Sequence, residues 1–107
     1  MAGVIATLRK PDSTVDGGYR YYPNGFINII SFMVDLNNCG AGFEYGRIVV
    51  STLTYLTKAD FDADPNDYIT LNKGGVPLIV LPYVRHSDPV DAAIVQLKEW
   101  FPDAVEV

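Results

Sequence analysis

Apolar and β-branched residues occur along this chain in short runs, of which residues 26–36 form the longest. Apolar side chains stand at odd and at even positions of that run, so a strand built from it is apolar on both faces. Strict alternation places Phe26 and Phe32 on one face, and Ile27 and Met33 on the other. A strand of this kind belongs in the middle of a sheet with a cover on each side. We therefore expect residues 26–36 to form the central strand.

Further strands are predicted on both sides of this run. The candidates are residues 4–8, 19–22, 47–57, 68–72 and 76–84. Asn24-Gly25 lies between two of these β-rich runs, and both residues tolerate positive φ, so we expect a tight hairpin turn there. The apolar period over residues 47–57 is unclear, and a helix over the same residues is the alternative interpretation.

The last β-rich run carries its own signals. Gly74-Gly75 precedes it and predicts a second hairpin, which joins residues 68–72 to residues 76–84. Pro77 and Pro82 cannot donate a backbone hydrogen bond to a neighbouring strand. We therefore expect this run at an edge of the sheet or at a bend.

Two segments carry helix signals. Asp88-Pro89 places a good N-cap before a residue suited to the first helical position. The apolar residues that follow share one helical face, and they are Val90, Ala93, Ile94, Leu97 and Phe101. The proline after Phe101 ends this helix. Thr57 and Asp60 have the spacing of a capping box, with Asp in place of the usual Glu, which predicts a short helical turn before Pro65.

These elements predict an α+β fold, with an antiparallel or mixed sheet of about five strands and one C-terminal amphipathic helix packed on it. A chain of 107 residues is near the common domain size, so we expect one domain over residues 1–107. Hydrophobic residues make up 49% of the chain and charged residues 20%, which indicates a folded protein. The second apolar face of the central strand also needs a cover, either from loops or from another copy of the chain.

The chain is acidic, and this limits its partners. The net charge is −5 and ten of the thirteen acids are Asp, a residue of turns and caps. Phosphate backbones repel such a protein, so we expect no direct binding to nucleic acid, whereas a basic protein partner is compatible with the charge. The longest apolar run is too short to span a bilayer and no signal-peptide pattern begins the sequence. We expect a cytoplasmic protein with no membrane partner.

Residues 60–67 contain four of the acids and no basic residue. Unpaired carboxylates are prohibitively costly to bury, so this stretch must lie at the surface. We select its acids as candidate partner-binding residues: Asp60, Asp62, Asp64 and Asp67. The first three match alternate ligand positions of a calcium loop, but Pro65 replaces the required glycine and Leu71 replaces the bidentate Glu. We predict no metal site, and a solvated acidic turn is the alternative interpretation.

A second candidate surface comes from the tyrosines near residue 20. Tyrosine and arginine are enriched in protein interfaces, and the segment Tyr19-Arg20-Tyr21-Tyr22 contains both. We therefore select Tyr19, Tyr21 and Tyr22 as partner-binding residues. The alternative is that these are ordinary amphipathic strand residues, with their rings on the sheet and their hydroxyls in water.

No assembled catalytic set is visible in the sequence. Cys39 and His86 are the only cysteine and histidine, and with Asp88 they could supply a nucleophile, a base and an orienting group. One cysteine and one histidine cannot close a zinc shell. Residues 40–42 have the sequence Gly-Ala-Gly, as in a phosphate-binding turn, but the third glycine is misplaced and a β-rich segment follows. Asp35 is the one acid in the long apolar run, and we expect it to cap a turn.

The sequence thus predicts a non-catalytic protein-interaction module with no cofactor. A particular form is an acidic inhibitor that presents the 60–67 carboxylates to a basic, nucleic-acid-binding protein. The alternative is a structural subunit of a homo-oligomeric or larger assembly. A third hypothesis is a small enzyme or ligand binder that uses Cys39, His86 or the acidic loop.

Overall fold

Three long strands form the centre of the structure, and each comes from a run rich in β-branched and aromatic residues. They are β1 (Gly3–Pro11), β2 (Tyr19–Asp35) and β3 (Arg47–Tyr55). Two short strands complete a five-stranded antiparallel sheet, β4 (Ile79–Pro82) and β5 (Val105–Glu106). The structure is a computed structural model, and it describes residues 3–37, 39–70, 75–76 and 78–107.

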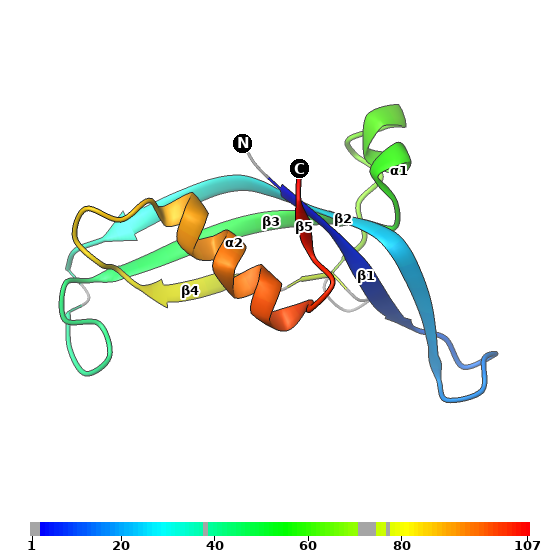
Figure 1. Cartoon of the computed structure of the whole chain (residues 1–107), viewed down its shortest axis with the longest axis horizontal. Helices are drawn as coiled ribbons and strands as arrows, with labels where there is room; N and C mark the ends of the chain where they lie inside the picture. The colour runs from blue at the N-terminus through cyan, green and yellow to red at the C-terminus, as the bar shows by residue number, and fades with distance from the viewer. Residues whose placement is uncertain (1–2, 38, 71–74, 77) are drawn as a thin grey trace.

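The strand order in the sheet is β4-β3-β2-β1-β5 (Figure 1). The central position of β2 is the one predicted from its two apolar faces. Residues 47–55 form a strand, so the helix considered for this segment is not formed. The edge position of β4 is also confirmed, and it fits Pro82, whereas Pro77 lies outside the described residues.

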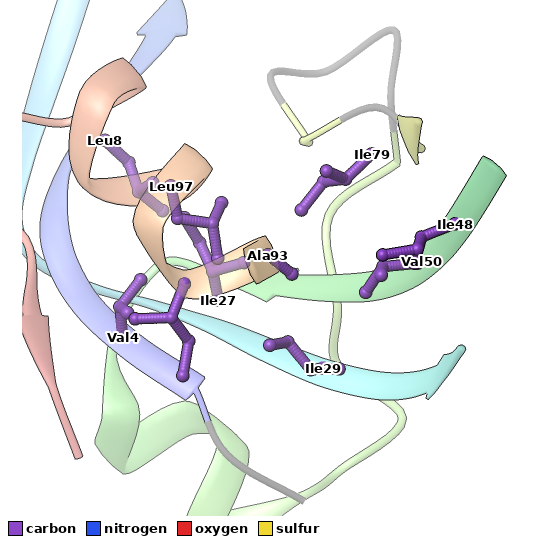
Figure 2. Close-up of a cluster of buried hydrophobic side chains, with 10 residues drawn as sticks. Val4, Leu8, Ile27, Ile29, Ile48, Val50, Ile79, Ala93 and Leu97 are labelled. Carbon is purple, nitrogen blue, oxygen red and sulfur yellow. The ribbon is translucent and has the colours of Figure 1, made fainter. Parts of the chain in front are cut away.

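One face of the sheet is covered by α2 (Pro89–Trp100), as the helical spacing predicted. The Asp88 carboxylate caps this helix by accepting a hydrogen bond of 2.8 Å from the Val90 N–H. Ala93 and Leu97 point from the helix towards the sheet (Figure 2). The buried core is made by both layers, and it consists of Val4, Leu8, Ile27, Ile29, Ile48, Val50, Ile79, Ala93, Ile94 and Leu97. The five-stranded sheet with a helix packed on it is therefore confirmed.

The hairpin turn expected at Asn24-Gly25 is not formed, because β2 runs through these residues without a break. Gly25 lies opposite Ala6, and a Cβ atom on it would be 2.1 Å from the Leu8 Cγ. The glycine is thus needed for close packing of the Leu8 side chain over the strand, and not for a turn. The β1–β2 register also shifts here by one residue, which is a β-bulge in β2.

The turn between β1 and β2 lies instead at residues 12–18. Gly17 and Gly18 both have positive φ, and the Asp12 N–H donates to the Gly18 carbonyl at 2.9 Å. The Asp12 carboxylate accepts hydrogen bonds from the Thr14 hydroxyl and N–H, and from the Arg20 guanidinium. These bonds, led by that of the Thr14 hydroxyl, lower the pKa of Asp12 to about 2.

A second bulge changes which side chains of β2 share a face. Ile29 pairs with Thr52 but Ser31 pairs with Ser51, so Ile30 is an extra residue in β2. Between the two bulges the odd-numbered side chains Ile27 and Ile29 point to the same face as α2, and beyond the second bulge the even-numbered ones do. Phe32, which lies opposite the buried Val50, is therefore on the α2 face. The strict alternation assumed from the sequence is wrong beyond residue 29.

The second predicted hairpin is described only in part. Residues 71–74 lie outside the described residues, and the predicted turn at Gly74-Gly75 falls partly among them. Ile69 forms an isolated bridge with Thr54, and its N–H donates to the Thr54 carbonyl at 2.8 Å. The strand predicted over residues 76–84 is shorter than expected, since β4 covers only Ile79–Pro82.

At Thr7 the outer edge of β1 forms hydrogen bonds with a side chain, the carboxylate of Asp103. The Thr7 N–H lies 3.1 and 3.2 Å from the two oxygens of the Asp103 carboxylate, and the Thr7 hydroxyl also donates to that carboxylate. These bonds lower the pKa of Asp103 because they stabilise its ionised form. The contact continues the edge that β5 forms against Val4 and Ile5.

The described part of the chain is elongated. Its radius of gyration is 15.0 Å, against about 13 Å for a compact chain of this length. The hairpin of β1 and β2 extends beyond the sheet at one end, and the loop between β2 and β3 extends at the other (Figure 1). Among the described residues, no helix has the length and apolar character needed to cross a membrane.

Candidate functional site

The acidic stretch begins with the short helix α1 (Lys58–Ala63), which the Thr57 and Asp60 spacing predicted. The Thr57 hydroxyl accepts a hydrogen bond of 3.0 Å from the Asp60 N–H and so caps the helix. Asp60 lies in the first turn, where a carboxylate is stabilised by the free N–H groups of the helix end.

Helix α1 is fixed to the sheet by an aromatic cluster on the face that α2 leaves free. The ring of Phe61 lies 5.0 Å from the ring of Phe26 and 5.0 Å from the ring of Tyr55. The Tyr55 hydroxyl donates a hydrogen bond of 2.5 Å to the carbonyl of Pro65, where the acidic stretch turns. Burial raises the pKa of Tyr55, so this hydroxyl keeps its proton up to a higher pH than an exposed tyrosine does. The acidic stretch is therefore held at both ends.

The carboxylates of this stretch do not converge on one point. Asp60 and Asp62 are two residues apart in a helix, so their side chains leave it about 200° apart. The Asp62 carboxylate pairs with the Lys58 ammonium at 2.8 Å, and the Asp64 carboxylate accepts from the Asn66 N–H at 3.0 Å. Among the described residues, no group of three or more His, Cys, Asp or Glu side chains is arranged to hold a metal ion. The arrangement is an acidic surface, which we call the acidic corner (Asp60, Asp62, Asp64 and Asp67).

The three selected tyrosines lie in the extended part of the β1–β2 hairpin and differ in their surroundings. Tyr21 is 62% exposed, and Tyr19 carries the Arg9 guanidinium 4.3 Å above its ring centre. Tyr22 packs against the buried core and is only partly exposed. Within the described residues, no hydrogen bond or ring contact joins these tyrosines to the acidic corner.

A row of apolar side chains crosses the face of the sheet opposite α2. Met33 of β2 pairs with Val49 of β3, and Val49 pairs with Val80 of β4. Met33 is 52% exposed and Val80 is 46% exposed. Helix α1 covers the same face only near Phe26 and Tyr55. The second apolar face predicted for β2 is thus real but only partly covered, and its members in β3 and β4 were not identified from the sequence.

A hollow in the described structure lies at the end of the molecule away from α1. Its volume is about 400 Å³, and its walls are Leu36, Tyr45, Tyr83, Arg85 and His86. These residues come from the β2–β3 loop and from the segment after β4. Sequence reasoning named only His86, and in a different role. No local pattern could have found the site, because its walls meet only through the tertiary fold.

The other candidates for chemistry are not brought together by hydrogen bonds. The Cys39 thiol lies 3.1 Å from the Leu36 carbonyl, and the Asp88 carboxylate serves as the cap of α2. Asp35 accepts from the Asn37 N–H at 3.0 Å, which confirms its predicted role in a turn. Residues 40–43 form a turn that leads into β3, so no helix end faces the two glycines.

A scan against protein-family models found no matching model, and searches of curated proteins and of solved structures gave no significant match.

Proposed function

We propose that this chain is a non-catalytic protein-interaction module of the α+β class, which acts in the cytoplasm through its acidic corner. The observation that supports this proposal is the rigid support of that corner. The Thr57 cap, the Phe61 ring contacts and the Tyr55–Pro65 hydrogen bond hold the backbone, while Asp62, Asp64 and Asp67 stay exposed.

A fixed acidic surface suits a basic partner for two physical reasons. Charges held in place before binding lose little conformational entropy when the complex forms. A patch of like charge also accelerates association with a surface of the opposite charge. A partner that itself binds nucleic acid has such a basic surface, so an inhibitor that occupies this surface is the particular form that we propose.

The proposal predicts that charge removal at the acidic corner weakens capture of the partner. In the triple variant Asp62→Asn, Asp64→Asn, Asp67→Asn we expect at least about tenfold weaker capture, since charges at an interface each contribute a fraction of a kcal/mol to binding. Asp60 is left intact because it stabilises α1. Capture of the partner from native cells by the immobilised chain, at low and at high salt, measures this effect. High salt screens the carboxylates and should therefore also weaken capture.

A matched triple variant, Asp16→Asn, Glu44→Gln, Glu99→Gln, controls for net charge because these exposed acids lie elsewhere. It should retain the same captured protein. Capture that persists in the Asp62, Asp64 and Asp67 variant, or that is insensitive to salt, contradicts the proposal.

A second candidate function is a structural subunit that associates with copies of itself. The row of Met33, Val49 and Val80 supports it, because an apolar strand face can pack on its own twofold mate. The edges of the sheet are less suitable, since β4 has four residues including Pro82 and β5 has only two. A face-to-face dimer would bury the row and complete the cover of β2.

Light scattering over a range of concentrations tests this second function. We expect the apparent mass of the wild type to double as concentration rises, and Val80→Lys to remain monomeric because it places an unpaired charge in the contact. Val95→Lys on the exposed side of α2 is the control and should still dimerise. A wild type that stays monomeric at about millimolar concentration, far above a typical dissociation constant, excludes the dimer.

A further inference from the structure

We infer that the hollow lined by Leu36, Tyr45, Tyr83, Arg85 and His86 binds a small planar ligand that carries a carboxylate or a phosphate. This site is at the other end of the molecule from the acidic corner, and the inference does not depend on the proposed function. Its volume of about 400 Å³ falls within the range of small-molecule sites.

The walls of the hollow are held by backbone hydrogen bonds. The Tyr83 N–H donates to the Gly46 carbonyl at 3.0 Å and so joins the segment after β4 to the β2–β3 loop. The Gly46 N–H donates to the Phe43 carbonyl at 3.1 Å within that loop. Both the N–H and the hydroxyl of Ser87 donate to the Val84 carbonyl, which closes the turn that carries Arg85 and His86. The backbone that carries the lining side chains is therefore fixed before a ligand binds, although most of these side chains are exposed.

Arg85 provides the charge that selects an anion. Three of the four described arginines have a partner within the chain: Arg9 has Tyr19, Arg20 has Asp12 and Arg47 has Asp35. Arg85 makes no ion pair, hydrogen bond or ring contact with any described residue, although the chain has an excess of acids. A guanidinium can form two parallel hydrogen bonds to a carboxylate or phosphate.

The backbone of His86 gives independent support. Its φ of 67° is the only positive φ of a non-glycine residue in the described structure. Such conformations are uncommon, and they are enriched at functional sites, where the surroundings hold them. The strained residue here is next to the unpaired arginine and lines the same hollow.

The remaining walls favour a flat ligand body. Tyr45 and Tyr83 are aromatic and Leu36 is aliphatic, so the hollow offers ring faces and apolar surface beside the cation. A smaller hollow of about 220 Å³ shares both tyrosines and is also lined by Glu44, which would repel an anion. The anionic group therefore belongs next to Arg85, with the planar body against the tyrosines.

The test is an NMR titration of the full chain, which follows the backbone amide signals of the residues that line the hollow. The probes are phenyl phosphate, benzoate, inorganic phosphate and phenol. We expect saturable shifts with phenyl phosphate or benzoate, and at least about tenfold weaker binding of inorganic phosphate and of phenol, since each has only half of the recognised chemistry. The relative affinities of phenyl phosphate and benzoate distinguish a phosphate from a carboxylate ligand.

Arg85→Gln should weaken binding of the better anion at least about tenfold, because it removes the charge but not the hollow. Arg9→Gln is the control, since Arg9 lies in the β1–β2 hairpin, and it should leave the affinity unchanged. The amide spectra of both variants also report whether the fold is retained. Absence of saturable shifts at these residues up to about 20 mM probe, or equal affinity of wild type and Arg85→Gln, overturns the inference.

Discussion

Replacing Leu97 by alanine is expected to lower the free energy of unfolding by about 3 to 5 kcal/mol, the largest loss that we foresee for one side chain. Leu97 is fully buried and points from α2 into the core between Leu8 and Ile27 (Figure 2). Its removal leaves a cavity between the helix and the sheet, and α2 is the only described element over that face of the core. Urea unfolding measures the change, and we expect the midpoint to fall with little change in slope.

Val95→Ala is the matched control, because Val95 is in the same helix but 59% exposed. It should change the free energy of unfolding by less than about 0.5 kcal/mol. Similar losses for Leu97→Ala and Val95→Ala would show that α2 does not pack on the sheet as described.

Gly46→Ala is expected to cost about 3 kcal/mol, since two penalties combine at one position. The φ of Gly46 is +109°, which side chains rarely adopt, and an added Cβ would lie 2.5 Å from the Asp35 carbonyl oxygen. The positions of the added Cβ atom and of the Asp35 carbonyl oxygen are both set by the backbone, so a change of side-chain rotamer cannot relieve this clash. Thermal unfolding gives the readout, with a fall in the midpoint of more than about 10 °C.

Substitutions at two other glycines of the same loop distinguish the cost of the positive φ from the cost of the steric clash. Gly42 has a φ of +83° but open space around it, so Gly42→Ala should show the backbone cost alone, about 1 kcal/mol. Gly40 has neither constraint, and Gly40→Ala should be close to neutral. We therefore expect Gly46→Ala to be the least stable of the three variants and Gly40→Ala the most stable. A Gly46→Ala variant that is no less stable than Gly42→Ala would contradict this expectation.

Helices were predicted accurately because their signals are local. Asp88 and Pro89 define the start of α2 within two residues, and Thr57 caps α1 through a bond that spans three. Such contacts depend on neighbours in the sequence, which a pattern can identify. The central position of β2 was also predictable, since apolar residues on both faces leave it no other place.

Strand details depend on partners far away in the sequence and could not be predicted. Asn24-Gly25 has a strong turn signal, but β2 continues through these residues. Gly25 is needed there because the Leu8 side chain of the neighbouring strand occupies the space of a Cβ atom. The acidic residues at 60–67 were identified from the sequence, and their alternate spacing resembled that of side chains that converge on one ion. In the structure they do not converge, because the helix directs the side chains of Asp60 and Asp62 to different sides. The hollow beside Arg85 was missed because its walls come from two segments about forty residues apart in the chain.

The bulge at Ile30 has a consequence for changes in chain length. Ile29 and Ser31 already pair with the adjacent residues Thr52 and Ser51, so Ile30 occupies no position of its own in the β2–β3 ladder. A chain without Ile30 could keep every one of these pairs, and Phe32 would still face the same side. Removal of a residue from a strand normally exchanges its inner and outer side chains. At this one position the sheet can absorb a deletion, which makes residue 30 a natural place for the length of β2 to vary.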